Sequence, residues 1–128
     1  MDEPICKIMS SDLVTADADD TVEQVAESMR ASGLACVPVL QGGGVIGIIT
    51  TDNLLQLKAA RRDPSQLHAW EICSYRPAEV ASGTPASEVA RLMTERQIHH
   101  VIVTDNKDIK GVVSSLDFVR QFVRDNGS

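Results

Sequence analysis

The stretch Gly-Ile-Ile-Thr-Thr-Asp-Asn-Leu, residues 47–54, decides the fold, because a matching stretch, Gly-Val-Val-Ser-Ser-Leu-Asp-Phe, occupies residues 111–118. Each begins with glycine, continues with β-branched residues typical of a strand, and passes through a hydroxyl residue into a helix-like sequence. An offset of 64 residues separates them in a chain of 128. The same offset aligns further identical residues: Ile8 with Ile72, Ser10 with Ser74, Val25 with Val89, Ala26 with Ala90, Met29 with Met93, Val37 with Val101, and Val39 with Val103. We interpret the chain as one unit written twice.

The pattern around the first copy predicts a helix, a hairpin and a second helix. Asp20, with Glu23 three residues later, predicts a helix start, and Gly33 predicts its end. Residues 36–40 and 45–50 are short β-rich runs joined by a glycine-rich turn, which predicts a hairpin. Residues 51–62 return to helical composition.

The second half repeats this order. A helix is expected to start at Thr84 with Pro85 in its first position, hairpin strands are expected at 100–104 and 109–114, and a last helix at 115–124. Short extended pieces are expected before the first helix of each half, near residues 13–16 and 78–81. Each half is therefore predicted to be β-α-β-β-α.

The domain boundaries follow from this duplication. We assign residues 1–62 to the first repeat, 63–67 to a linker and 68–128 to the second repeat. A unit of about 60 residues has a marginal hydrophobic core of its own, so the two repeats are expected to pack together as one structural unit.

Composition excludes several classes of protein. The net charge of −6 disfavours nucleic acid and anionic membranes as partners. The sequence has no apolar run approaching the ~20 residues of a membrane span, and its acidic start lacks the pattern of an export signal. Its three cysteines are odd in number and lack paired spacing, which disfavours disulfides and a metal site. A cytoplasmic location fits best.

Because of these two ordered repeats, the chain resembles a tandem pair of CBS (cystathionine β-synthase) domains, also called a Bateman module. The supporting motifs are Leu-Ala-Cys-Val-Pro-Val at 34–39 and Ile-His-His-Val-Ile-Val-Thr-Asp at 98–105. The resemblance implies an α+β fold of two repeats related by pseudo-two-fold symmetry, with helices against small three-stranded sheets. It also implies homodimers, and binding of AMP, ADP, ATP or S-adenosylmethionine in the cleft between repeats, with AMP the first choice.

Ser114 and Asp117 are the leading ligand-binding candidates. Ser114 ends a predicted strand at a helix N-terminus, whose free amides attract phosphate, and Asp117 can accept the hydroxyls of a ribose. The resemblance assigns Asp117 to the ribose. The same spacing is also a capping box, in which both side chains only satisfy the helix amides.

The first repeat has Thr50 and Asn53 at the matching positions, and an Asn cannot accept two ribose hydroxyls as a carboxylate can. His99 and His100 align with positions where some relatives place a phosphate-binding His-Arg pair. Adjacent strand residues face opposite ways, so at most one of the two histidines is expected to enter a given cleft. The equivalent pair in the first repeat, Ala35 and Cys36, carries no charge.

Four further residues belong to the expected adenine wall. The resemblance places Thr15 and Val80 beside the base, and the backbone at Val37 and Val101 at its edge. The alternative is that these residues are ordinary parts of core strands.

The sequence presents no convincing nucleophile with its base, metal cluster or carboxylate pair, so an enzyme is not expected and no cofactor is required. We expect a regulatory module that binds an adenosine nucleotide and transmits this to an unknown partner protein. The alternative is a ligand-free, constitutively dimeric interaction module with vestigial pockets. Asn53, Ala35 and Cys36 motivate that alternative.

Overall fold

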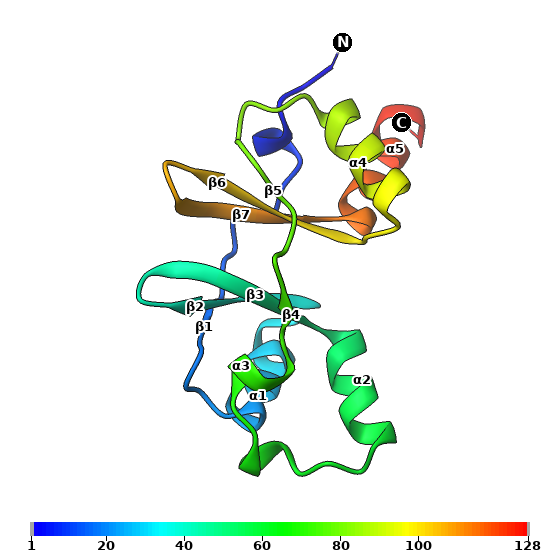
Figure 1. Cartoon of the computed structure of the whole chain (residues 1–128). Coiled ribbons are helices and arrows are strands. Elements are labelled where there is room, and N and C mark those ends of the chain that lie inside the picture. Colours follow the sequence, from blue (N-terminus) through cyan, green and yellow to red (C-terminus); the bar gives the residue numbers. More distant parts are fainter. Residues whose placement is uncertain (1, 128) are drawn as a thin grey trace. The chain divides into compact units, whose positions relative to one another are not determined.

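The computed structural model describes residues 2–127, which form two compact units. One unit contains residues 14–77, and the other contains residues 2–13 together with residues 78–127 (Figure 1). The compact units therefore differ from the sequence repeats, because residues 2–13 group with the second repeat.

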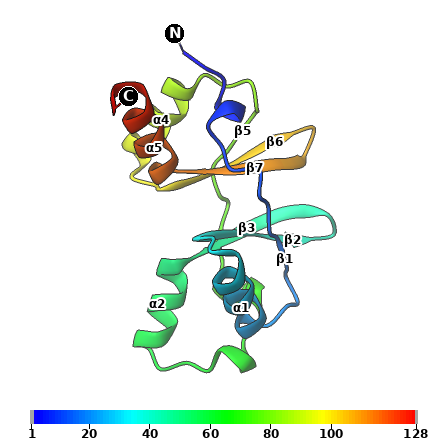
Figure 2. The ribbon, with the colours of Figure 1, turned by 180° about the vertical axis from the view of Figure 1, so that it is seen from behind.

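The unit of residues 14–77 contains a four-stranded sheet in the order β1 (Ala16–Asp17), β2 (Cys36–Gln41), β3 (Gly44–Thr50) and β4 (Ser74–Tyr75). β1 runs parallel to β2, and the other neighbours are antiparallel. Three strands were expected, so β4 is an addition that comes from beyond the predicted linker. The helices α1 (Val22–Ser32), α2 (Thr51–Ala59) and α3 (Ala69–Ile72) lie on one side of this sheet, and a short 3-10 turn, η2 (Pro64–Gln66), precedes α3 (Figures 1 and 2).

The second unit contains a three-stranded sheet in the order β5 (Glu79–Val80), β6 (His100–Asp105) and β7 (Asp108–Ser114). β5 is parallel to β6, and β6 is antiparallel to β7. The helices α4 (Ala86–Arg96) and α5 (Ser115–Gly127) lie on the same side of the sheet as η1 (Ile5–Lys7), the 3-10 turn of the N-terminal segment (Figure 2). The predicted mixed α+β architecture is confirmed.

The two hairpins have the same register, as a duplication requires. Val37 pairs with Ile49 and Val101 with Val113, and each hairpin has one irregularity at the equivalent place, after Val39 and after Val103. Alternate positions of these strands face the helices, and the side chains there are completely buried: Val37, Val39, Ile49, Val101, Val103 and Val113. They form the centre of the core in each unit.

The repeated glycines Gly47 and Gly111 allow another segment to cross the hairpin closely. A Cβ at Gly47 would lie 2.6 Å from the carbonyl oxygen of Ser74, and one at Gly111 would lie 2.5 Å from that of Ser10. Any larger residue would displace the crossing segment. The identity between repeats at this position therefore reflects a packing requirement.

Two helix starts differ from the prediction by one residue. α1 begins after Thr21, which forms a capping box with Gln24 instead of the expected pair Asp20 and Glu23. α4 begins at Ala86, so Pro85 is the capping residue and has no side-chain donor or acceptor to offer. The N-terminal segment caps this helix instead: the Ser87 N–H donates to Asp2 Oδ1 over 3.1 Å, and the Ser87 hydroxyl donates to the same carboxylate.

A second carboxylate fastens the loop after β5 to the β6–β7 turn. The Ser82 hydroxyl donates to Asp105 Oδ2 over 2.5 Å, and its backbone N–H donates to Oδ1 over 3.1 Å. These two hydrogen bonds lower the pKa of Asp105 below its usual value, and the bond from the Ser82 hydroxyl has the larger effect.

Among residues 2–127, the helices are all too short or too polar to cross a membrane.

Candidate functional site

The second repeat brings four predicted site residues to one end of the β6–β7 hairpin, where α5 begins. Antiparallel pairing sets His100 opposite Ser114. His99 reaches the first residue of α5, since the Ser115 N–H donates to the His99 carbonyl over 3.0 Å and His99 Nδ1 lies 3.2 Å from Ser115 Oγ. Asp117 follows in the first turn of the helix. The hairpin-to-helix junction therefore brings four predicted site residues close together: His99, His100, Ser114 and Asp117.

Asp117 uses one of its carboxylate oxygens to cap α5. Its Oδ2 accepts the Ser114 N–H over 2.8 Å and lies 3.2 Å from the Ser114 hydroxyl, while the Asp117 N–H lies 3.4 Å from that hydroxyl. The other oxygen, Oδ1, lies 3.4 Å from Arg120 Nη1. Ser114 and Asp117 therefore form the capping box, and this cap uses only the Oδ2 oxygen of the Asp117 carboxylate.

At this junction the positive end of α5 and the negative charge of Asp117 act in opposite directions on an anion near Ser114 and Ser115. The start of α5 presents the positive end of the helix dipole, and its first amides lack partners within the helix. The His99 side chain is exposed beside it, and its imidazole can donate a ring N–H to an acceptor. The chemistry available is hydrogen bonding and charge attraction.

The corresponding site in the first repeat has a different role. Asn53 Oδ1 accepts the Thr50 N–H over 2.8 Å, which is the same capping distance as in the second repeat. Its amide nitrogen, however, lies 3.4 Å from the Ile72 carbonyl oxygen and 3.2 Å from Ser74 Oγ. Asn53 therefore donates to the segment that enters β4, which a carboxylate could not do. This long-range contact explains the Asn, and neighbouring positions alone give no signal of it.

The other residues of this junction add no positive charge. Cys36 lies opposite Thr50 in the hairpin and is buried. Burial raises the pKa of its thiol to about 12, so it stays neutral at physiological pH. Ala35 contributes only its carbonyl, which accepts the Thr51 N–H over 3.2 Å.

The residues of the predicted adenine wall separate into two kinds. The Val37 and Val101 side chains are fully buried, so a ligand could meet only their backbone. Val80 is half-buried in β5, and Thr15 is exposed just before β1. Thr15 and Val37 share a hollow of about 190 Å³ beside α1, and the residues that line it do not include Thr50 or Asn53.

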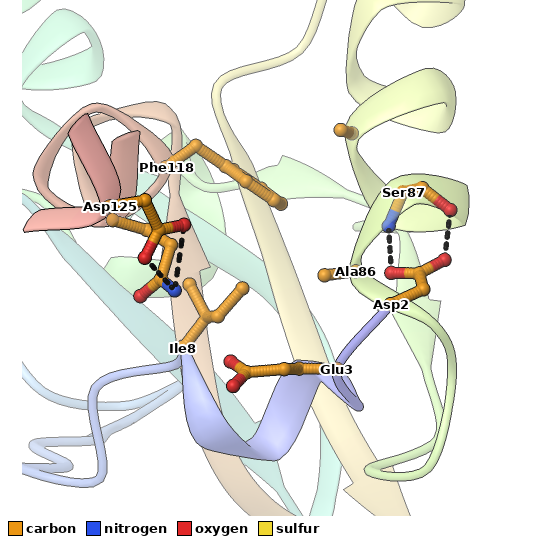
Figure 3. Close-up of a pocket in the computed structure, with 9 residues that line it drawn as sticks. Asp2, Glu3, Ile8, Ala86, Ser87, Phe118 and Asp125 are labelled. Carbon is orange, nitrogen blue, oxygen red and sulfur yellow. Dashed lines mark hydrogen bonds between the residues drawn. The ribbon is translucent and has the colours of Figure 1, made fainter. Parts of the chain in front are cut away.

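A larger hollow of about 380 Å³ lies between the N-terminal segment, α4 and α5 (Figure 3). Ile8 and Phe118 form its apolar side, while Asp2, Glu3 and Asp125 place carboxylates around it. Three acids would repel a phosphate, so the hollow does not suit a nucleotide. Sequence reasoning missed it because residues 2–8 are far along the chain from α4 and α5. Within residues 2–127, His, Cys, Asp and Glu side chains form no group of three or more that could hold a metal ion.

Comparisons with known proteins agree with the duplicated fold. The family model described as "CBS domain" matches residues 5–60 and 69–124. The Bacillus subtilis protein YlbB is 27% identical over 109 residues, which cover 84% of this chain and 74% of YlbB.

Two solved structures show the same fold. The hexameric CBS-CP12 protein from bloom-forming cyanobacteria has a TM-score of 0.89 at 22% identity, covering 100% of this chain and 73% of that one. MJ1225 from Methanocaldococcus jannaschii, suggested in its description to be an archaeal homologue of g-AMPK, has a TM-score of 0.81 at 22% identity, covering 94% of this chain and 48% of that one.

Proposed function

Because this chain belongs to the CBS domain family and carries two copies of the domain, we propose that it is a regulatory module that binds an adenosine nucleotide through its second repeat. The observation that carries the proposal is the junction of β7 and α5, where Ser114, Asp117 and His99 meet at a helix N-terminus. AMP is the first ligand to test, followed by ADP, ATP and S-adenosylmethionine.

Each part of the nucleotide has a chemical counterpart in the second repeat. The ribose hydroxyls donate to Asp117, whose Oδ2 is already fixed by the Ser114 N–H over 2.8 Å. The phosphate approaches the start of α5 and the exposed His99. The adenine lies against Val80 and the backbone near Val101. Since Asn53 is committed to Ile72 and Ser74, we expect one site per chain.

The ligand signal needs a second molecule to act on. Four apolar side chains of α5 are more than half exposed: Leu116, Val119, Phe122 and Val123. Positions three and four apart lie on one helix face, so these residues form a continuous apolar strip, which we call the α5 face. We propose that a second copy of the chain covers the α5 face. A hexameric relative of the same fold supports self-association.

Nucleotide binding would then act by population shift. A ligand that binds one arrangement of the dimer more tightly moves the equilibrium toward it, and a regulated partner protein senses the change. The proposal includes no catalytic step. A cytoplasmic location suits a nucleotide ligand and the free thiols of Cys6, Cys36 and Cys73.

A second candidate function rests on a specific observation. Asp117 already caps α5, and Asn53 is fully engaged, so both junctions are satisfied without a ligand. This favours a ligand-free dimer whose pockets are vestigial. The two candidates differ in whether a ligand replaces Arg120 at the Oδ1 oxygen of Asp117.

The deciding experiment is calorimetric titration of the wild-type protein and of Asp117→Asn with AMP. The first repeat shows that an Asn at this position caps its helix at the same 2.8 Å, so the variant should fold normally. It removes the negative charge and replaces an acceptor oxygen with a donor. We expect micromolar binding at one site per chain by the wild-type protein and at least about tenfold weaker binding by the variant.

The outcomes separate the candidates. Equal binding by both proteins would show that Asp117 is not a ligand residue. No heat with AMP, ADP, ATP or S-adenosylmethionine, from protein that melts cooperatively, would leave the ligand-free dimer. Circular dichroism melting of both proteins serves as the control for folding.

A further inference from the structure

We propose that Arg120 competes with the ligand for Asp117 and so sets the affinity of the second repeat for ribose-bearing ligands. This inference rests on the proposed function. It assigns Arg120 as an affinity-determining residue that occupies the binding oxygen while the site is empty.

The two oxygens of Asp117 have different partners. Oδ2 is held by the backbone N–H of Ser114 over 2.8 Å, a contact that α5 needs for its cap. Oδ1 faces only a side chain, because Arg120 Nη1 approaches it to 3.4 Å from one turn further along the helix. A ribose hydroxyl can therefore use Oδ1 without breaking the cap, provided that the guanidinium moves away.

The burial of the two side chains shows which of them moves. The Asp117 side chain is 13% exposed, whereas that of Arg120 is 63% exposed. The carboxylate is thus fixed and the guanidinium is free to swing into solvent. An exposed ion pair of this length changes an equilibrium by at most about fivefold, so Arg120 lowers the affinity without blocking the site.

The first repeat provides a matched substitution. The position equivalent to Arg120, 64 residues earlier, is Gln56, next to the junction that we assign a structural role. Arg120→Gln therefore introduces a residue that the same fold already accepts. Gln has a helix propensity close to that of Arg, so α5 should not be weakened.

The test measures two ligands on two proteins by calorimetry. AMP has both ribose hydroxyls, and 2′,3′-dideoxy-AMP lacks them while keeping the base and the phosphate. We expect Arg120→Gln to bind AMP about two- to fivefold more tightly than the wild-type protein, with unchanged affinity for the dideoxy analogue. The melting temperatures of the two proteins should agree.

Several results would overturn this inference. Equal affinity of both proteins for AMP would show that Arg120 does not compete. Weaker binding of both ligands by Arg120→Gln would show that its charge attracts the phosphate instead. In either case wild-type binding of AMP leaves the proposed function intact, whereas failure of both proteins to bind AMP removes the proposed function and this inference together.

Discussion

Replacing Gly111 by alanine tests the close crossing that organises the second unit. The new Cβ would lie 2.5 Å from the Ser10 carbonyl oxygen and 2.8 Å from the Met9 sulfur. The Ser10 backbone cannot retreat easily, because its N–H donates to the Val112 carbonyl over 3.0 Å and its carbonyl accepts the Val112 N–H over 3.2 Å. Relief of the overlap would stretch both hydrogen bonds.

The magnitude follows from these contacts. Forcing an extra carbon into a packed site costs about 1–3 kcal/mol, and losing a backbone hydrogen bond costs about 1 kcal/mol. Because a backbone oxygen is the nearest atom, we expect the upper part of this range, about 3 kcal/mol of unfolding free energy.

The assay is urea unfolding followed by far-ultraviolet circular dichroism, with Gly83→Ala as the matched control. A Cβ at Gly83 meets no atom within 4 Å, and this glycine belongs to the same unit. The unfolding free energy of the control should stay within about 0.5 kcal/mol of that of the wild-type protein. A loss of unfolding free energy below about 1 kcal/mol for Gly111→Ala, with an unchanged m-value in urea, would refute the argument that the crossing requires glycine.

Four further predictions concern other parts of the chain. Asn53→Asp should lose about 1–2 kcal/mol of unfolding free energy, because the carboxylate cannot donate to its two partners across the unit, and it should not create a second AMP site in calorimetry. Asp105 has a lowered pKa in the folded protein, so its contribution to stability is complete above the unfolded value near 4 and is lost as pH falls through the folded value. Asp105→Asn should flatten the dependence of the unfolding free energy on pH over this acidic range, and an unchanged slope would count against a stabilising role for the two Ser82–Asp105 hydrogen bonds. In native protein at pH 8, Cys6 should react with a thiol reagent within minutes while Cys36 stays protected by burial, and rapid labelling of Cys36 by mass spectrometry would contradict its place in the core. Phe122→Glu should shift the protein toward monomer in analytical ultracentrifugation, because it places a charge in the α5 face; an unchanged sedimentation coefficient would exclude that face as the contact between copies.

The predictable parts of the fold depend on contacts that are close in sequence. The hairpins of both repeats were predicted because β-branched residues flank a short turn, and the structure pairs them at the expected positions. Ser114 and Asp117 could be placed together because three residues separate them at a helix start. Arg120 is three residues beyond Asp117, so helix spacing could have identified that pair as well.

The unpredicted parts depend on contacts between distant positions. The β3–β4 pairing joins Gly47 to Tyr75, the tether joins Asn53 to Ser74 across 21 residues, and the cap that Asp2 gives to Ser87 spans 85. No periodicity in the sequence records such pairings. These contacts give Asn53 a structural role in the first repeat, which the sequence difference between Asn53 and Asp117 does not reveal by itself.

The grouping of residues 2–13 with the second repeat also affects how the chain folds during synthesis. Residues 14–77 are contiguous, so this unit has all of its chain once residue 77 has left the ribosome. The N-terminal segment is made first but must wait, because the Ile5 N–H bonds to the Thr84 carbonyl and Ser10 bonds to Val112, which are translated much later. Ile5, completely buried in the finished protein, is therefore synthesised before residues 14–77 and is covered only after Thr84 has been made. A nascent chain in which residues up to about 80 have left the ribosome would hold one completed unit and an exposed apolar segment, which is the kind of surface that chaperones bind.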